Sequence, residues 1–389
     1  MKELEFDVVM HLVGGQTIPN YMAVKLSEAR RHVLVVTDET SRQFDILRRA
    51  FKEQGEDFIG KITVPATDYK TIRQILAEDK NVFAGQRVAV NITGGPKPMS
   101  TAALDLCREH GFVPFYIDTN MRLIQFFAEP YKSIDLPPAF STVQEFLELA
   151  GYAVENSGAK PQDVLTPEKR MLLRSLWDSR EKIGRAIVKF AYASKPKDWK
   201  PGENKQMTYG AAVEELERIS QSSMKDAMLI GSWRRLFGRE PDMDAAAFGG
   251  GVWLEQWLLM RLADSKNGQL LKDIRQGVKV KIDSSSDKTA QDIDIAFTDG
   301  YVLTLVECKA GYDGVKQEVV QKLENLRLNV GGVMGKGVIF SMREVRDEML
   351  RQRISFGKLS LVESGATETY ANNFAKVRDG KAYRRSNDY

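Results

Sequence analysis

The stretch Leu-Val-Glu-Cys-Lys at positions 305–309 decides how the C-terminal part of this chain is expected to fold. Its apolar start predicts a β-strand. Residues two apart on a strand share one face, so Glu307 and Lys309 project together while Cys308 points the other way. Asp294 lies one strand and one turn upstream, between two isoleucines. Three charged groups that converge on adjacent strand ends make poor core residues but a usable hydrolytic site.

The residue types at this site favour a divalent metal ion. Asp294 and Glu307 supply the carboxylate oxygens that suit Mg²⁺ or Mn²⁺, and Lys309 can orient water or stabilise charge on a phosphate. Glu255, on a predicted helix upstream, either completes the metal shell or is a solvated residue between two tryptophans. Lys322 either contacts a substrate phosphate or lies on the surface. Taken alone, the Glu-x-Lys pair is common and is better explained by a salt bridge on an exposed strand.

The elements predicted around this site follow one another in a defined order. A helix over 252–263 precedes strands near 278–282, 293–297 and 302–308. A helix over 315–330, a strand at 337–341, a helix through Leu350 and a strand at 359–363 complete the region. The order α-β-β-β-α-β is that of a restriction-endonuclease-like core.

The first half of the chain alternates short apolar strands with amphipathic helices. This rhythm predicts a doubly wound, Rossmann-like sheet that ends near Pro130 and residues 136–138. The predicted strands cover 6–12, 32–37, 61–64, 87–92, 112–117 and 123–127, and the helices between them cover 19–27, 41–54 and 69–78.

Two polar loops follow strands of this predicted sheet at its carboxyl edge, where such folds bind ligands. The loop at 91–100 reads Asn-Ile-Thr-Gly-Gly-Pro-Lys-Pro-Met-Ser and opens a helix, whose N-terminus favours an anion. A plain strand-to-helix turn would also use such glycines and prolines. The second loop, after the first strand, favours the nucleotide-binding interpretation. The candidate ligand-binding residues are Gln16, Thr17, Thr93, Gly94, Gly95, Lys97 and Ser100.

The middle of the chain is predicted to be helical and carries no chemical motif. Apolar residues recur at helical spacing over 167–193, and further helices are expected at 211–220 and 223–237, after a polar segment at 194–209. We expect residues 151–240 to form a helical connector.

Composition narrows the functional classes. The chain has 389 residues, which suggests two or three domains, and its two cysteines exclude a disulfide framework or a cysteine zinc site. No apolar run is long enough to cross a membrane, so a cytoplasmic protein is expected. The net charge of +3 alone implies no nucleic-acid partner, although residues 315–389 carry 14 Lys or Arg against 9 Asp or Glu. No histidine follows His110, which excludes an imidazole base in the C-terminal part.

The two sets of motifs together resemble a known family. Asn-Ile-Thr-Gly-Gly-x-Lys-x-Met-Ser at 91–100, with Gln-Thr-Ile-Pro-Asn at 16–20, is similar to a CARF domain, the Rossmann-like sensor of cyclic oligoadenylates. Gly-Gly-x-Trp-x-Glu at 250–255, Asp-Ile-Asp at 292–294 and Val-Glu-Cys-Lys at 306–309 resemble a PD-(D/E)XK nuclease. The whole chain therefore resembles the CRISPR ancillary nucleases of type III systems.

This resemblance implies a homodimer whose paired CARF domains bind one cyclic oligoadenylate, most simply cyclic tetra-adenylate. Binding would activate a metal-dependent nuclease that cuts DNA, RNA or both. The implied domains are a CARF domain at 1–150, the connector at 151–240 and a PD-(D/E)XK domain at 241–389. The ligand residues would be Gln16, Thr17, Thr93, Gly94, Gly95 and Lys97, and the nuclease residues Glu255, Asp294, Glu307 and Lys309. The alternative is a non-catalytic regulator in which a nucleotide gates DNA binding.

Overall fold

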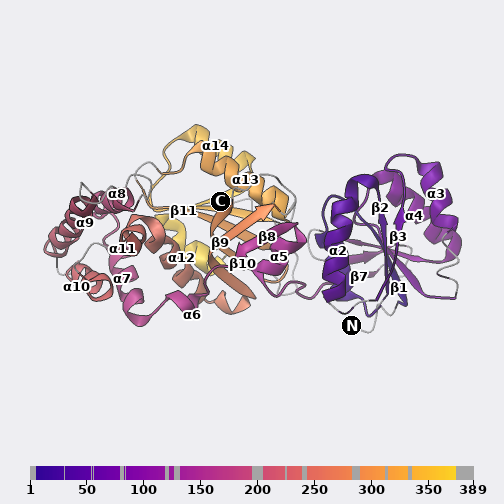
Figure 1. Cartoon of the computed structure of the whole chain (residues 1–389), viewed down its shortest axis with the longest axis horizontal. Helices are drawn as coiled ribbons and strands as arrows, with labels where there is room; N and C mark the ends of the chain where they lie inside the picture. Colours follow the sequence, from indigo (N-terminus) through magenta and orange to yellow (C-terminus); the bar gives the residue numbers. More distant parts are fainter. Residues whose placement is uncertain are drawn as a thin grey trace. The chain divides into compact units, whose positions relative to one another are not determined.

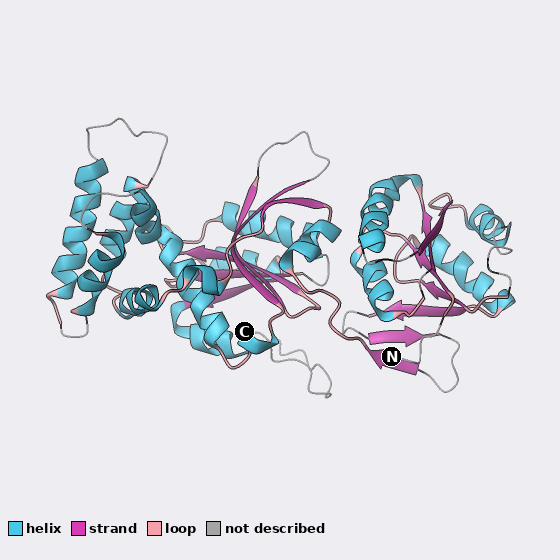
Figure 2. Cartoon of the chain, turned by 60° about the horizontal axis from the view of Figure 1, so that its bottom comes forward, coloured by secondary structure: helices cyan, strands magenta, loops and turns pink. Residues whose placement is uncertain are grey.

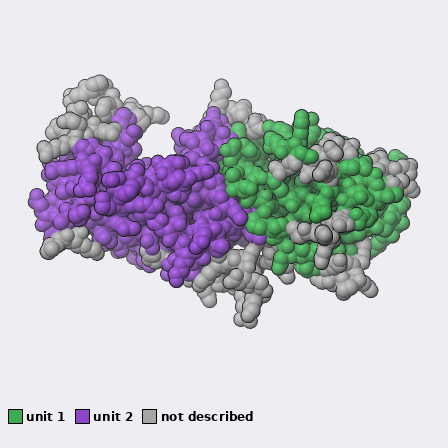
Figure 3. All heavy atoms as spheres, turned by 90° about the horizontal axis from the view of Figure 1, so that it is seen from below, with its two compact units in different colours: residues 1–153, 282–287, 329–334 green, residues 154–281, 288–328, 335–389 purple. Residues whose placement is uncertain are grey.

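The computed structural model describes residues 6–29, 31–53, 55, 57–78, 83, 85–118, 122–126, 132–194, 205–223, 226–238, 243–282, 290–311, 314–331 and 335–373. The chain divides into two compact units (Figure 3). Unit 1 contains residues 1–153, and unit 2 contains most of the remainder. Gln54, Phe127, Pro130, residues 195–204 and the basic stretch after 373, to which the expectations above refer, lie outside the described residues.

Unit 1 contains a seven-stranded sheet in the order β3-β2-β1-β4-β5-β6-β7. The first five strands pair in parallel, and β6 and β7 pair antiparallel at one edge. The doubly wound sheet predicted from the sequence is confirmed, with one strand, β7, that the sequence did not reveal. The strands are β1 (Val8–Leu12), β2 (Arg31–Val36), β3 (Asp57–Thr63), β4 (Val88–Asn91), β5 (Val113–Ile117), β6 (Arg122–Gln125) and β7 (Lys132–Asp135).

Helices cover both faces of this sheet (Figure 1). On one face α3 and α4 pack together, and a core forms between alternate strand residues such as Met10 and Val35 and helix residues such as Leu76 and Met99. On the other face α2 contacts α1 and α5. Burial of each such aliphatic side chain stabilises the fold by roughly 1.5–3 kcal/mol. The helices are α1 (Ile18–Leu26), α2 (Ser41–Glu53), α3 (Tyr69–Glu78), α4 (Lys97–His110) and α5 (Val143–Leu149).

Unit 2 begins with a helical region that follows the predicted pattern with one difference. The apolar run over 167–193 forms two helices rather than one, because the chain turns at 179–183. Another helix starts earlier than predicted, within the expected polar segment. The helices are α6 (Pro161–Val164), α7 (Pro167–Asp178), α8 (Gly184–Ala193), α9 (Lys205–Ser220), α10 (Met228–Phe237) and α11 (Met243–Ala247).

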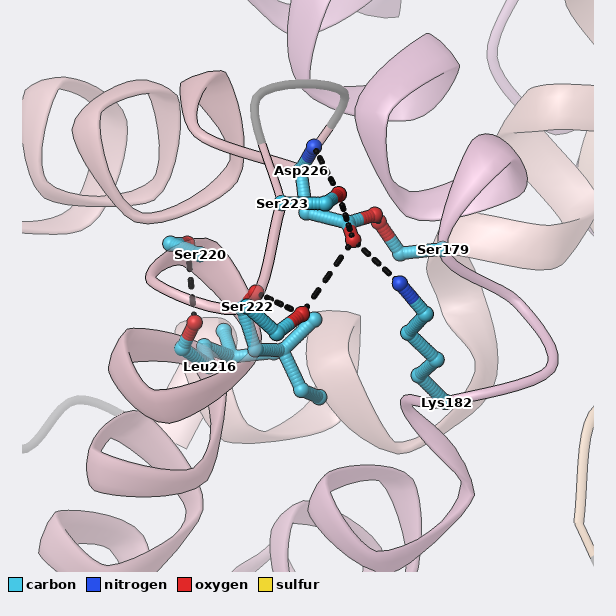
Figure 4. A network of polar contacts seen from close by, with 8 residues as sticks. Ser179, Lys182, Leu216, Ser220, Ser222, Ser223 and Asp226 are labelled. Carbon is cyan, nitrogen blue, oxygen red and sulfur yellow. Dashed lines mark hydrogen bonds and ion pairs between the residues drawn. The ribbon is translucent and has the colours of Figure 1, made fainter.

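A buried carboxylate explains the break between α7 and α8 (Figure 4). Asp226 precedes α10 and is 1% exposed. Its Oδ1 accepts a hydrogen bond from Ser179 Oγ at 2.6 Å, and its Oδ2 accepts from Lys182 Nζ at 2.5 Å and from Ser223 Oγ at 2.7 Å. Desolvation raises the pKa of Asp226, but these donors outweigh it and hold the pKa below its ordinary value. A buried charge requires such partners, so the turn is fixed to the start of α10.

The second sheet has six strands in the order β13-β12-β11-β10-β9-β8. Strands β9, β10 and β11 pair antiparallel, whereas β11, β12 and β13 pair in parallel. Figure 2 shows this sheet with helices beside it. The predicted α-β-β-β-α-β order is confirmed, and the edge strand β8 is an addition. The strands are β8 (Tyr152–Asn156), β9 (Asp273–Ile282), β10 (Gln291–Thr298), β11 (Leu303–Lys309), β12 (Lys336–Ser341) and β13 (Leu359–Glu363), with helices α12 (Trp253–Asp264), α13 (Gln317–Gly331), α14 (Glu348–Phe356) and α15 (Thr367–Asn373).

Helix α12 is buried between the second sheet and α7. Its Trp257 stacks on Trp177 of α7, with ring centroids 3.5 Å apart. The glycines that precede α12 serve close packing: a Cβ added to Gly249 would lie 2.5 Å from the ring of Phe190, and one added to Gly250 would lie 2.9 Å from the backbone of Ala191. The polar side chains of α12 that face the sheet are therefore held in one position. Among the described residues, no helix is long and apolar enough to cross a membrane.

Candidate functional site

The strand ladder of the second sheet brings Asp294 and Glu307 together. Ile295 of β10 pairs with Val306 of β11 in antiparallel register, so Asp294 and Glu307 are the next residues on the two neighbouring strands. The backbone N–H of Cys308 donates a hydrogen bond to Asp294 Oδ2 at 2.7 Å. The carboxylate of Asp294 is thereby fixed against the strand that carries Glu307.

Glu307 is the most enclosed carboxylate of this cluster. It is 7% exposed, and both of its oxygens contact ammonium groups. Lys309 Nζ lies 2.7 Å from Oε1, and Lys322 Nζ, which comes from α13, lies 3.3 Å from Oε2. The predicted pairing of Glu307 with Lys309 on one strand face is thus present in the structure.

Glu255 reaches the same cluster from α12. Its Oε2 accepts a hydrogen bond from Gln276 Nε2 of β9 at 2.9 Å. Burial raises the pKa of Glu255 above its ordinary value, and the neighbouring charges of Asp294 and Glu307 raise it further. A solvated residue would show neither effect. Of the two interpretations of Glu255, the structure therefore favours the one in which it belongs to the site.

The site concentrates negative charge in a partly desolvated place. Burial and the charge of Glu307 also raise the pKa of Asp294. Desolvation lowers the pKa of Lys309, but the adjacent Glu307 outweighs it and the net shift is upward. Three carboxylates face two ammonium groups, and their mutual repulsion is only partly compensated. Buried carboxylates with pKa values shifted in this way are found at many functional sites.

A divalent ion fits the chemistry of these donors but not their present positions. Within the described part of the chain, no group of three or more Asp, Glu, His or Cys side chains is arranged so that it could hold a metal ion. Both oxygens of Glu307 are in contact with ammonium groups, those of Lys309 and Lys322. Carboxylate oxygens are the ligands that Mg²⁺ and Mn²⁺ prefer, and a cation would relieve the repulsion that raises the pKa values of Glu255 and Asp294.

In unit 1 the two predicted polar loops touch each other. Adjacent parallel strands β1 and β4 end beside one another, and the loops after them pack backbone against backbone. A Cβ added to Gly94 would lie 2.3 Å from the carbonyl oxygen of Leu12, and one added to Gly14 would lie 2.8 Å from the amide nitrogen of Gly95. Gly95 also has a φ of +79°, which favours glycine. The glycines are therefore required by the approach of the two loops.

The candidate ligand residues of these loops divide into two groups. Thr17 donates to the carbonyl oxygen of Leu149, Thr93 Oγ1 donates to Asn91 Oδ1 at 2.7 Å, and Ser100 Oγ donates to the carbonyl oxygen of Gly94 at 3.4 Å. These three hydroxyls brace the loops. Gln16 and Lys97 are exposed, and Lys97 begins α4. An amide, a cation and a helix N-terminus at one sheet edge suit an anionic ligand.

Two buried asparagines that sequence reasoning did not select hold this edge in place. Asn20 Nδ2 donates to the carbonyl oxygen of Leu12 at 3.0 Å, and Asn91 Nδ2 donates to that of Pro19 at 3.1 Å. Both asparagines lie in quoted motifs, directly beside the glycine loops. The signal available in the sequence was an asparagine at a predicted strand end and another at a predicted helix start, where a short polar side chain can bond to the backbone of a neighbouring loop.

Two family models match the chain, one within unit 1 and one mostly within unit 2. Residues 8–137 match the family model described as the Card1 CARF domain, and residues 242–370 match that described as the Card1-like endonuclease domain. No curated protein sequence matches the chain significantly.

Solved structures share its fold. Can2 from Sulfobacillus thermosulfidooxidans, solved in complex with cyclic tetra-adenylate, has a TM-score of 0.70 at 18% identity, covering 93% of this chain and 95% of its own. Protein VC1899 from Vibrio cholerae has a TM-score of 0.71 at 16% identity, covering 94% and 96%. A type III CRISPR defence DNA nuclease activated by cyclic oligoadenylate has a TM-score of 0.52 at 18% identity, covering 90% of this chain but 51% of its own.

Proposed function

We propose that this chain is a nuclease activated by a cyclic oligoadenylate in type III CRISPR defence, because residues 8–137 match the model of the Card1 CARF domain and residues 242–370 match that of a Card1-like endonuclease domain. The observation that carries the nuclease function is the convergence of Glu255, Asp294, Glu307 and Lys309 in the endonuclease domain. Glu255 comes from α12, Asp294 from β10, and Glu307 and Lys309 from β11.

The proposed reaction is hydrolysis of a phosphodiester in DNA, RNA or both. Asp294, Glu307 and Glu255 would hold Mg²⁺ or Mn²⁺, which when bound polarises the phosphate and lowers the pKa of water. Lys309, close to Glu307, can hold the attacking water or donate to a phosphate oxygen that gains charge. Water adds to phosphorus, the bond to the leaving ribose oxygen breaks, and that oxygen takes up a proton.

The proposed activator site lies at the edge where β1 and β4 end. Gln16 and Lys97 are placed to contact the ligand directly, and the backbone amides near Gly94 and Gly95 can approach a phosphate. Thr17, Thr93 and Ser100 would act by bracing the loops or by turning toward the ligand. A cyclic oligoadenylate presents several phosphates, and cyclic tetra-adenylate is the ring we favour.

The domain boundaries and assembly belong to the same proposal. We assign the sensor to 1–150, the helical connector to 151–240 and the nuclease to 241–389. The proposed active form is a homodimer in which one cyclic oligoadenylate contacts the Gly94–Lys97 loop of each subunit. A role in defence against invading nucleic acid places the protein in the cytoplasm.

One assay tests this function. The purified protein is incubated with Mn²⁺ or Mg²⁺ and plasmid, single-stranded DNA or RNA, with and without cyclic tetra-adenylate. We expect cleavage that requires both metal and activator. Activator binding and nucleic-acid binding without any cleavage would instead favour the non-catalytic regulator.

The variant Glu307→Ala identifies the site. Loss of the central carboxylate should lower the cleavage rate by at least about a hundredfold, because metal and Lys309 both depend on it. Activator affinity should not change. Glu318→Ala, an exposed carboxylate at the start of α13, is the matched control. Full activity of Glu307→Ala would refute the assignment.

A further inference from the structure

Lys322 is the side chain of this site for which the proposed function has no role. It comes from α13, and its Nζ lies 3.3 Å from Glu307 Oε2 and 2.9 Å from the carbonyl oxygen of Asp292. Lys309 Nζ lies 2.7 Å from the other oxygen of Glu307. The carboxylate at the centre of the site is therefore held on both sides by ammonium groups.

The two lysines differ in their surroundings. The side chain of Lys309 is 26% exposed, whereas that of Lys322 is 39% exposed. Water screens an ion pair with one partner this open, so the pair contributes less free energy than a fully buried pair would. Lys322 can consequently leave Glu307 at small cost. Its ammonium then remains next to the site, because α13 is fixed by buried residues such as Leu323 and Leu326.

The balance of charge indicates what the released ammonium would bind. Without metal, the two ammonium groups of Lys309 and Lys322 at most balance the carboxylates of Asp294 and Glu307, and ionisation of Glu255 makes the cluster negative, so it does not attract an anionic substrate. A divalent cation reverses this balance only if both lysines stay close. An ammonium next to a metal-bound carboxylate is then attracted to a phosphate oxygen, with which it forms a charge-assisted hydrogen bond.

We propose that Lys322 competes with the divalent metal ion for Glu307 and, once displaced, binds a phosphate of the nucleic-acid substrate. This inference rests on the proposed nuclease function and adds a residue to it. It requires that Lys322 oppose metal binding but favour cleavage. A residue with a purely structural role would affect both in the same direction.

The test compares Lys322→Met, which keeps the length of the stem, with Lys316→Met, an exposed lysine just before α13. Mn²⁺ binding to the metal-stripped full chain is measured by calorimetry. Lys322→Met should bind Mn²⁺ about threefold to tenfold more tightly, because a competing cation is gone. At saturating Mn²⁺ and cyclic tetra-adenylate, its cleavage should be slower by about tenfold or more. Lys316→Met should match the wild type in both measurements.

Lys322→Arg restores a cation and should recover part of the cleavage rate. Circular dichroism of each variant checks folding, and Lys322→Gln replaces Lys322→Met if the latter does not fold. Wild-type Mn²⁺ affinity together with a wild-type rate would overturn the proposal, as would weaker Mn²⁺ binding. In both cases the wild-type protein still binds metal and cleaves, so the proposed function stands. A wild-type protein that binds no Mn²⁺ and cuts no substrate would refute both.

Discussion

Glu255 links the stability of the nuclease domain to pH. Burial and the charges of Asp294 and Glu307 raise its pKa in the folded protein. A group whose folded pKa is raised contributes stability that is complete below its unfolded pKa and is lost as pH rises through the folded pKa. Without metal, ionised Glu255 therefore destabilises the domain progressively above the ordinary carboxyl pKa of 4.5. The proposed metal site therefore lowers the free energy of unfolding of the metal-free domain at neutral and higher pH.

The variant Glu255→Gln removes this penalty while its amide oxygen still accepts from Gln276. The melting temperature of the metal-stripped protein should rise by about 2–4 °C at pH 8 and stay near that of the wild type at about pH 5. Addition of Mn²⁺ should stabilise the variant less than the wild type. Glu214→Gln, an exposed carboxylate on α9, is the control. An equal shift at both pH values would show that Glu255 does not carry the repulsion.

At the scale of elements, both candidate sites depend on close approaches of backbone. The loops after β1 and β4 meet where Gly94 faces the carbonyl oxygen of Leu12, and that oxygen also accepts from Asn20. In unit 2, Gly249 and Gly250 let the chain before α12 pack on α8. In unit 1 a methyl group would push apart the two loops that carry candidate ligand residues, and in unit 2 it would push the start of α12 away from α8. Helix α12 thereby directs Glu255 toward the second sheet.

Gly94→Ala tests the approach of the two loops. The added Cβ would lie 2.3 Å from a backbone oxygen that cannot move without β1, so we expect unit 1 to lose roughly 1–3 kcal/mol of stability. Gly15→Ala is the matched control, because nothing lies within 4 Å of its added Cβ. Denaturant unfolding followed by circular dichroism measures the difference. Equal stability of the two variants would contradict the packing role of Gly94.

At the scale of the whole molecule, the chain divides into two compact units, and each contains one candidate site. A ligand bound in one unit changes activity in the other only if it binds the active state more tightly than the inactive state. In the proposed mechanism, the coupling free energy would come from ligand contacts such as those of Lys97, which is exposed at the start of α4. Activation of this kind does not require the activator to contact the carboxylate cluster around Glu307.

Lys97→Ala separates activation from catalysis. Loss of the cation should raise the cyclic tetra-adenylate concentration for half-maximal cleavage by about tenfold, because a charge-assisted contact to phosphate is lost. The maximal rate at saturating activator should stay near that of the wild type. Lys52→Ala, an exposed lysine of α2, is the control. An unchanged activation curve would exclude Lys97 from the activator site.

Much of the candidate nuclease site in unit 2 could be predicted, because the local periodicity of the strands determines which residues share a face. The two-residue repeat of a strand places Glu307 and Lys309 on one face, and the isoleucines beside Asp294 place that residue on the opposite face from theirs. Glu255 stayed undecided because the rotation of α12 about its axis depends on Trp257 and Trp177, which are far apart in sequence. The turn between α7 and α8 was not predicted for the same reason, since Asp226 lies far along the chain.

The amino-acid sequence by itself determined the order along the chain of most strands and helices, without β7 and β8, together with the glycine loops and the acidic residues on β10 and β11. These follow from interactions between residues close together in the chain. Only the tertiary structure decided that Glu255 lies among those carboxylates, that Gly14 and Gly94 sit in touching loops, and that Lys322 contacts Glu307. Each of these depends on packing between elements separated in sequence, which no local pattern records.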